Sequence, residues 1–251
     1  MEESIIFTIF EGLPRQGPGS DACTTRALGL IPGNPLDILD IGCGSGKSTL
    51  VLARLSPHSK ITAVDIYQPF LDDLSERAKK EKLDAGITTV RASMDDLPFP
   101  DSAFDLIWSE GAAYIMGFKE ALLSWKKFLK PGGYMAVSEC VWFTETPSNE
   151  SLAFFNEIYP AIMHEQKVKA LIEELGYEVL GVFRLPDNAW LDEYYNPLSR
   201  KLKILRQKYK DDAEVQVILD SMDNEMKIFR SHSREYGYSF FIMRKKEDGY
   251  P

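Results

Sequence analysis

Three glycines at alternate positions, Gly42, Gly44 and Gly46, follow a short apolar run that begins at Leu36. The run has the pattern of a buried β-strand, and from about Lys47 the apolar residues are spaced as in a helix. Because glycine has no Cβ, the chain can turn sharply there and a ligand can lie against bare backbone. Ligands of parallel sheets bind in the crevice at the carboxyl ends of the strands. We therefore expect a nucleoside-binding crevice at this turn.

Two acidic residues accompany the turn. Asp40 comes just before the glycines, and Asp65 ends the next apolar run. An ionised carboxylate has two acceptor oxygens, so Asp65 at a strand end is suited to accept both hydroxyls of a ribose. The alternative is a structural role, in which Asp65 caps the helix that begins near Tyr67 or Gln68.

Two phosphate-binding motifs are similar to this turn but differ from it in spacing. The dinucleotide fingerprint needs its third glycine one residue after Gly46, and the P-loop needs a glycine where Ile41 stands. The spacing disfavours both motifs. Lys47 is then interpreted as a solvated residue on the first turn of the helix.

The composition excludes several classes of protein. The chain has 251 residues, 44% hydrophobic content and a net charge of −9, which suits an α/β domain with an insertion. The negative charge disfavours nucleic acid as a partner, because phosphates need a basic surface. The cysteines and histidines have no paired or ligand spacing, so neither a disulfide framework nor a metal site is predicted. The N-terminal apolar run is too short for a signal or membrane helix, and we expect a cytoplasmic protein without a membrane span.

From residue 36 onward, short apolar runs alternate with longer runs of helical period. This alternation is typical of βαβ units and predicts an α/β fold with a mostly parallel sheet. The sequence Lys-Pro-Gly-Gly at 130–133 predicts a turn, and helices are expected over 149–163 and 165–175. Seven strands are predicted, at residues 36–41, 60–65, 87–91, 104–108, 134–139, 178–185 and 236–244.

Two segments depart from the alternation. Residues 1–35 are predicted to form an N-terminal arm with a short helix near 21–30, and residues 36–251 the main domain. Residues 187–233 are charged and carry apolar side chains at helical spacing. We expect them to form a helical insertion that covers the sheet as a lid.

The segment Asp-Ile-Gly-Cys-Gly-Ser-Gly at 40–46 resembles the first motif of class I S-adenosylmethionine-dependent methyltransferases, and is most similar to the branch of quinone-biosynthesis and small-molecule enzymes. The resemblance runs through most of residues 36–185. It implies a Rossmann-like sheet of seven mostly parallel strands with helices on both faces and an antiparallel last strand. It also implies methyl transfer from S-adenosylmethionine to a small-molecule acceptor by in-line displacement. Four later landmarks follow in the family's order, at 64–65, 93–99, 104–108 and 129–133.

The resemblance also implies which residues bind the cofactor. Gly42 and Gly44 would supply bare backbone, and Asp65 the ribose contact. Met94 and Asp95 would lie at the adenine, where the neighbouring acid or a simple Asx-turn is the alternative for Asp95.

Three further residues belong to the predicted cofactor site. Asp40 would reach the ammonium group of the ligand, or else only orient the glycine turn. Ser20 lies in a small-residue segment of the arm that would close over the cofactor. Glu110 follows the fourth strand, at the mouth of the crevice, where it would contact the methionine portion or face the acceptor.

Methyl transfer needs alignment and the exclusion of water, and it needs a base only when the nucleophile keeps a proton. The candidate bases are Glu110, Tyr114, Glu139 and His164. A histidine has a suitable pKa for such a role, although His164 stands between two predicted helices, where a surface or capping residue is the alternative.

Aromatic residues near the predicted mouth and lid offer a site for the acceptor. They would line an apolar pocket or hold an amine by cation–π attraction, and the alternative for each is a place in the core. Together with the acids at the strand ends, they favour an amine. The sequence is also compatible with a homo-oligomer. The aromatic residues are Trp108, Trp142, Phe143, Trp190, Tyr194 and Tyr195.

Two other functions remain open at this point. One is an NAD(P)-dependent oxidoreductase on a Rossmann sheet, against which the displaced third glycine counts. The other is a non-catalytic protein that binds S-adenosylmethionine as a regulatory signal, since a fold does not determine a function.

Overall fold

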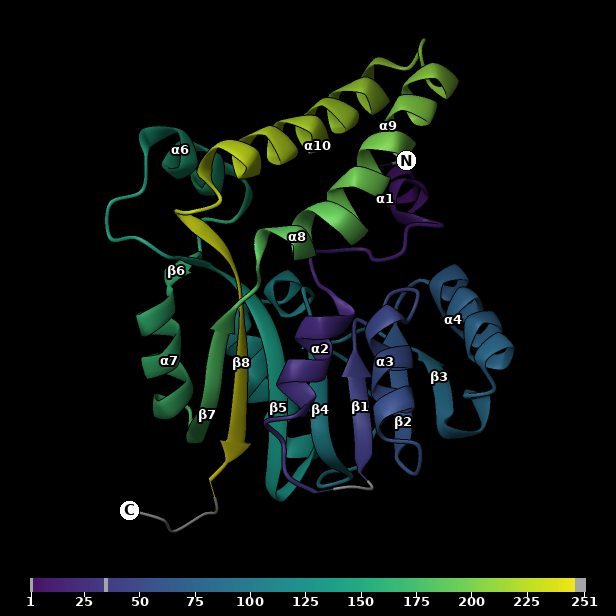
Figure 1. Cartoon of the computed structure of the whole chain (residues 1–251), viewed down its shortest axis with the longest axis vertical. Helices are drawn as coiled ribbons and strands as arrows, with labels where there is room; N and C mark the ends of the chain where they lie inside the picture. Colours follow the sequence, from purple (N-terminus) through teal and green to yellow (C-terminus); the bar gives the residue numbers. More distant parts are fainter. Residues whose placement is uncertain (1, 34–35, 247–251) are drawn as a thin grey trace.

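A mixed sheet runs through the molecule, with helices on both faces (Figure 1). The computed structural model describes residues 2–33 and 36–246, with side chains from residue 5 onward. The strand order is β3-β2-β1-β4-β5-β8-β7, in which β8 is antiparallel to both of its neighbours and the other pairs are parallel. The strands are β1 (Asp37–Ile41), β2 (Lys60–Asp65), β3 (Ile87–Arg91), β4 (Phe104–Glu110), β5 (Leu129–Trp142), β6 (Met163–His164), β7 (Tyr177–Arg184) and β8 (Tyr236–Lys245).

This arrangement confirms the predicted α/β fold, the seven predicted strands and the antiparallel last strand. Sequence reasoning missed β6, which pairs in parallel with Val141 and Trp142 of β5. A strand of two residues is too short for a period-two pattern to be visible in the sequence.

The turn predicted at 130–133 is wrong, because these residues lie inside β5. The register with β4 passes from Phe104 opposite Leu129 to Leu106 opposite Tyr134, so that 130–133 stand against a single residue of β4. The Pro-Gly-Gly sequence therefore forms a bulge in a continuing strand, where a missing N–H and a positive φ are tolerated.

The connecting helices lie near their predicted places. The predicted helix over 149–163 is too long: it ends at Ile158, because Tyr159 precedes Pro160 and the residue before a proline disfavours helical backbone. The helices of this part of the chain are α3 (Lys47–Leu55), α4 (Gln68–Glu81), α5 (Phe118–Trp125), α6 (Asn149–Ile158) and α7 (Glu165–Glu174), with short 3-10 helices η1 (Asp84–Gly86), η2 (Ala113–Ile115) and η3 (Lys126–Phe128).

The N-terminal arm contains two helices, α1 (Glu2–Phe10) and α2 (Asp21–Leu28). The second was predicted and the first was not. Helix α1 lies beside the lid helix α9 (Figure 1). The domain boundary was predicted between residues 35 and 36, and residues 34–35 lie outside the described residues.

The predicted insertion is helical and lies between β7 and β8. It sits above the edge of the sheet at which β1 ends (Figure 1). Its leucines at helical spacing, such as Leu198 and Leu202, are buried. The elements of this lid are α8 (Asp187–Trp190), the π-helix η4 (Leu191–Tyr195), α9 (Asn196–Lys208) and α10 (Ala213–His232).

Each face of the sheet has its own hydrophobic core. Phe240 and Phe241 are neighbours in β8, both are fully buried, and they belong to different cores because successive side chains of a strand point to opposite faces. The core around Phe240 extends through Trp108 into the lid, and the other includes Trp125 of α5. In the described part of the chain, none of the helices has the length and apolar composition needed to cross a bilayer.

Candidate functional site

The glycine turn lies at the carboxyl end of β1, between the neighbouring strands β2 and β4. Gly42 has a φ of 70°, and a Cβ on it would lie 2.5 Å from the Cβ of Ala112 in the loop after β4. Gly42 N–H and Cys43 N–H both donate to the carbonyl of Val64 in β2. The turn is therefore held against both neighbouring strands, at the point where the strand order reverses and ligands of this fold class bind.

Asp65 lies directly beside this turn. Its Oδ2 accepts a hydrogen bond from Gly44 N–H at 2.9 Å, and its Oδ1 accepts one from Tyr67 N–H at 3.0 Å. Tyr67 is the N-cap residue of α4, which has no side-chain cap, so Asp65 binds the turn before the helix and does not cap the helix itself. Each carboxylate oxygen retains a second lone pair, so both can still accept from a ribose hydroxyl. Burial raises the pKa of Asp65, while the backbone N–H groups of Tyr67, Gly44 and Ile66 oppose that shift.

Gln16 of the arm was not predicted from the sequence and lies against the same turn. Its Oε1 accepts hydrogen bonds from Ser45 N–H at 2.9 Å and from the Ser45 hydroxyl at 3.1 Å. A Cβ on Gly44 would lie 2.3 Å from this oxygen. No local pattern around Gln16 marks this contact, because it joins segments far apart in the chain.

Asp40 lies beneath the turn and is 1% exposed. Its Oδ2 accepts a hydrogen bond from the Thr49 hydroxyl at 2.7 Å, which ties β1 to α3. Burial raises the pKa of Asp40 to about 7, and the negative charges of Glu110 and Asp65 add to the rise. This geometry agrees with the second of the two roles considered for Asp40, that of orienting the glycine turn.

Glu110 ends β4, at the same edge of the sheet as the glycine turn, and is enclosed by donors. Its Oε1 accepts from the Thr24 hydroxyl at 2.7 Å and from Trp108 Nε1 at 3.0 Å. Its Oε2 forms an ion pair with Arg15 at 3.2 Å, in which the two side chains are 8% and 6% exposed. The sequence predicted the position of Glu110 and missed its cation, Arg15, which comes from the arm.

Arg15 joins three parts of the chain. Besides Glu110 of β4 it pairs with Glu193 of the lid at 2.8 Å and with Asp21 at 3.1 Å. Ser20 begins the adjacent helix α2, where its hydroxyl oxygen accepts from Cys23 N–H at 3.2 Å. The predicted small-residue segment of the arm is therefore close to Glu110: a Cβ on Gly19 would lie 3.0 Å from Glu110 Oε2.

Lys47 is less solvated than the sequence suggested. Its side chain is 28% exposed and lies 3.4 Å from Asp21 and 3.8 Å from Glu193.

The residues predicted at the adenine lie in the loop after β3. The methyl carbon of Met94 would be 3.7 Å from a Cβ on Gly42, so Met94 borders the glycine turn. Its carbonyl accepts from Trp125 Nε1 at 2.9 Å, which fixes the loop to α5. Asp95 is exposed, and the exposed Ile66 directly follows Asp65. Met94 and Ile66 thus place apolar side chains beside the turn and Asp65.

The four predicted bases do not form one group: Tyr114 and Glu139 both lie near Tyr159, whereas Glu110 and His164 have other partners. Glu110 forms an ion pair with Arg15. His164 belongs to β6, and its Nε2 lies 3.7 Å from the carboxylate of Glu145. Tyr114 is 42% exposed and packs edge-to-face on Tyr159, with ring centroids 5.8 Å apart. Desolvation, with the charges of Glu225 and Glu139, raises the pKa of Tyr114 to about 12. Near neutral pH, Tyr114 is therefore a hydrogen-bond donor and not a base.

Glu139 of β5 is the most unusual of the four. It is 1% exposed, its Oε1 accepts only from Cys140 N–H at 3.0 Å, and its Oε2 has no hydrogen-bond partner. Burial raises the pKa of Glu139 to about 8, and the nearby Tyr159 hydroxyl and Cys140 N–H oppose that shift.

The six aromatic residues proposed for the acceptor site are mostly core residues. Trp108, Trp142, Trp190, Tyr194 and Tyr195 are all buried, which agrees with the alternative considered for each. Trp190 stacks on Phe229, with ring centroids 4.3 Å apart. Phe143 is partly buried against the other core.

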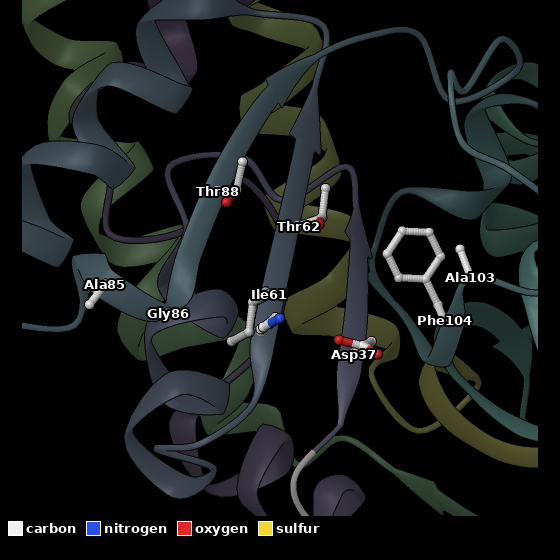
Figure 2. Close-up of a pocket in the computed structure, with 9 residues that line it drawn as sticks. Asp37, Ile61, Thr62, Ala85, Gly86, Thr88, Ala103 and Phe104 are labelled. Atoms are coloured by element: carbon white, nitrogen blue, oxygen red, sulfur yellow. The ribbon is translucent and has the colours of Figure 1, made fainter.

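A pocket of about 470 Å³ opens at the other end of the sheet (Figure 2). It is lined by Asp37 and Lys60 at the starts of β1 and β2, and by Phe104 at the start of β4. Since Gly42 and Asp65 are at the carboxyl ends of these strands, this pocket lies at the end of the sheet opposite to the glycine turn.

Comparison with known proteins agrees with the geometry of the turn. Residues 39–137 match the family model described as a methyltransferase domain. This segment is a methyltransferase domain. It holds the glycine turn, Asp65, the adenine-side loop and Glu110, so the resemblance stated from the sequence is confirmed.

Relatives extend beyond the methyltransferase domain. The 27-O-demethylrifamycin SV methyltransferase of Amycolatopsis mediterranei is 28% identical over 236 residues, which cover 89% of this chain and 83% of that protein. An O-methyltransferase of Aspergillus sclerotiorum is 28% identical over 155 residues, 60% of this chain. The chain spans only 58% of that protein's length.

Among solved structures, an S-adenosylmethionine-dependent methyltransferase from Geobacter sulfurreducens, in complex with S-adenosylhomocysteine, has the same fold. The TM-score is 0.82 at 20% identity, over 96% of this chain and 98% of that one. The likeness includes the arm and the lid as well as the methyltransferase domain.

Proposed function

We propose that this chain binds S-adenosylmethionine at the glycine turn and transfers its methyl group to a small molecule. One observation carries the proposal: the backbone at Gly42 and Gly44 turns against Asp65 at the switch point of a sheet whose residues 39–137 are a methyltransferase domain.

The residues of the crevice fit this cofactor. The remaining lone pairs of Asp65 suit the two ribose hydroxyls, and Gly44 N–H holds that carboxylate in place. Met94 and Ile66 offer apolar contacts to an adenine ring. Gln16 supports the turn, because its Oε1 accepts from Ser45 while its Nε2 donates to the carbonyls of Phe10 and Leu13 in the arm.

The sulfonium of S-adenosylmethionine supplies a methyl group that needs no further activation. The residues of this chain therefore bind, orient and exclude water, and positioning of this kind contributes about 7–11 kcal/mol to lowering a barrier. Arg15 helps to exclude water from the cofactor site, because its ion pairs with Glu110 and Glu193 hold the arm and the lid against the end of β4.

Calorimetry tests the proposal directly. S-adenosylhomocysteine should release heat on binding, and NADH should not, which also separates the methyltransferase from the oxidoreductase. Asp65→Ala should weaken the binding of S-adenosylhomocysteine more than about tenfold, because the substitution removes the acceptors for the ribose hydroxyls and the hydrogen bond to Gly44 N–H. Asp72→Ala is the matched control, since Asp72 lies exposed on α4 and accepts only from Gln68 Nε2.

An absence of heat with the wild-type protein would refute the proposal, and unchanged affinity of Asp65→Ala would remove Asp65 from the site. Binding without formation of S-adenosylhomocysteine from S-adenosylmethionine, across a broad metabolite panel, would favour the non-catalytic regulatory protein.

We further propose an amine as the acceptor, a cytoplasmic location and a homo-oligomeric state. The buried Glu139 and the half-buried Glu225 support the amine, and three free buried cysteines support a reducing compartment. Cell fractionation tests the location. Light scattering tests the oligomer, and the mass of a monomer would contradict it.

A further inference from the structure

Helices α9 and α10 of the lid form a hairpin at one end of the molecule (Figure 1). Arg206 of α9 ties the two helices together, because its guanidinium pairs with Asp220 of α10 at 2.7 Å and with Asp223 at 2.6 Å. Gln216 of α10 adds hydrogen bonds from its Nε2 to the carbonyls of Arg206 and Tyr209. The lid hairpin, residues 196–232, is therefore held together as one unit.

Each helix of the lid hairpin has one buried side and one exposed side. Leu202 and Leu205 of α9 and Leu219 of α10 are buried in the core around Phe240. Arg206 lies on the side between the two helices. The exposed sides of both helices therefore point away from the core and form the outer surface of the lid.

The two exposed sides differ in charge. The basic face of α9 consists of residues that are exposed and share one side of the helix by their spacing: Arg200, Lys203, Ile204, Gln207 and Lys208. The acidic face of α10 is defined in the same way and consists of Glu214, Val217, Asp220, Ser221 and Asn224. A chain with a net charge of −9 thus gathers three cations on one helix face, beside an acidic face on the next helix.

Each face has an exposed apolar residue among its charges. Ile204 and Val217 are both 68% exposed, the largest fraction among the exposed apolar side chains of the described residues. They lie four residues inside their helices, on either side of the turn at 209–212, so they stand at the same level of the lid hairpin. A single exposed apolar residue is ordinary on a protein surface, but two at one level form an apolar centre with a charged rim, as interfaces between proteins have.

The charges of the two faces are not balanced within one molecule. Among the side chains that the structure describes, Arg200, Lys203 and Glu214 form no ion pair. A two-fold axis that runs along the lid hairpin, between the helices, would place the basic face of each copy on the acidic face of the other. Ile204 would then meet Val217 of the partner subunit. A two-fold axis across the helices would instead bring like charges together, which is unfavourable.

We propose that the outer surface of the lid hairpin binds a second copy of this chain, with basic face on acidic face. The inference names the surface of the homo-oligomer proposed above, and it does not depend on methyl transfer. An anionic membrane would attract the basic face, but the acidic face beside it and the negative net charge of the chain would be repelled. The charge pattern therefore favours a second copy over a lipid surface.

The size of the surface sets the expected affinity. At 1.5 Å per residue and about 10 Å of width, the two helices present roughly 500 Å² per molecule. The total of about 1,000 Å² is at the small end of specific interfaces, which are often weak. We expect a dimer with a Kd on the order of tens of micromolar.

Sedimentation velocity on the full chain, from about 1 to 300 µM, should show a monomer–dimer equilibrium that weakens as salt is added. Ile204→Glu should leave a monomer throughout, because it places an acid against the partner's acidic face. Ile204→Lys should keep a dimer that is about tenfold weaker than wild type, since it loses the apolar contact but gains an opposite charge. At Val217 the order should reverse, with Val217→Glu the better tolerated. Leu123→Glu, at a position 49% exposed on α5, is the control and should not change the dimer.

The outcomes separate the surface from the oligomer. A monomer at every concentration would overturn both. A dimer that survives Ile204→Glu, or equal affinities of the Ile204→Glu and Ile204→Lys variants, would overturn the surface alone. Flotation of the protein with phosphatidylserine vesicles, lost in Lys203→Glu, would assign the basic face to a membrane and also overturn the inference. The exposed substitutions should leave the affinity for S-adenosylhomocysteine unchanged, and an absence of that binding in the wild type would refute the proposed function instead.

Discussion

Arg15→Met should destabilise the fold, because it leaves a buried carboxylate without its cation. Methionine keeps the apolar stem of the side chain and removes the guanidinium, which pairs with Glu110 of β4, Glu193 of the lid and Asp21. The Arg15 side chain is 6% exposed and that of Glu110 is 8% exposed. The substitution thus separates a loss of charge from a loss of packing.

The magnitude follows from the burial of each pair. Breaking a buried ion pair by removing one partner costs about 3–5 kcal/mol. Glu110 keeps the hydrogen bonds from Thr24 and Trp108, which favours the lower end of this range. Glu193 and Asp21 are 31% and 38% exposed, so their pairs are screened by solvent and add about 0–1 kcal/mol each. The expected loss, about 3–4 kcal/mol, is a large part of the 5–15 kcal/mol that roughly spans the stability of natural proteins.

Urea unfolding gives the measurement. Arg15→Met should lower the midpoint without changing the slope, because the same surface is exposed on unfolding. The double variant Arg15→Met/Glu110→Gln should recover about 0.5–3 kcal/mol relative to the sum of the single variants. Arg54→Met is the control: this side chain is 45% exposed, so the change should stay within about 0.5 kcal/mol.

Two results would refute this reasoning. A loss below about 1 kcal/mol in Arg15→Met would mean that Glu110 finds another partner in the folded protein. Additive effects in the double variant would mean that the two side chains do not interact.

Two further predictions concern stability at the site. The folded-state pKa of Glu139, about 8, is above its ordinary value of 4.5, so the unfolded chain loses the proton first and stability falls as pH rises between these values. Glu139→Gln should remove that fall and be more stable than wild type by about 2–4 kcal/mol at pH 8 but not at pH 4.5; parallel urea midpoints across this range would contradict it. Gly46→Ala should lower the melting temperature by several degrees, since Gly46 has a φ of 81° and a Cβ there would lie 2.1 Å from Leu74 Cδ1. Gly17→Ala, with open space around its Cβ, should leave the melting temperature unchanged.

The strands and the glycine turn were predictable because their signals are local. Alternating and continuous apolar runs mark the strands, and Gly42 and Asp65 end two of them. The bulge in β5 was missed, because Pro-Gly-Gly has the same composition in a bulge as in a turn.

The partners within the site were not predictable. Arg15 and Gln16 belong to the arm, and nothing in their neighbours indicates that one meets Glu110 and the other Ser45. Such contacts depend on how distant segments pack. The same holds for Glu139, whose position on β5 could be predicted while its burial and its unpaired oxygen could not.

The place of β8 in the sheet constrains how the protein can assemble. Strand β7 is made before the lid, yet in the described structure it pairs only with β8, which follows the lid in the chain. The backbone N–H and C=O groups of β7 therefore stay exposed to water until α8, α9, α10 and then β8 have been synthesised. Non-local pairing of this kind slows folding and exposes strand edges. We expect the half that contains β1 to β4 to form first, and β7 to dock last, when β8 inserts between it and β5.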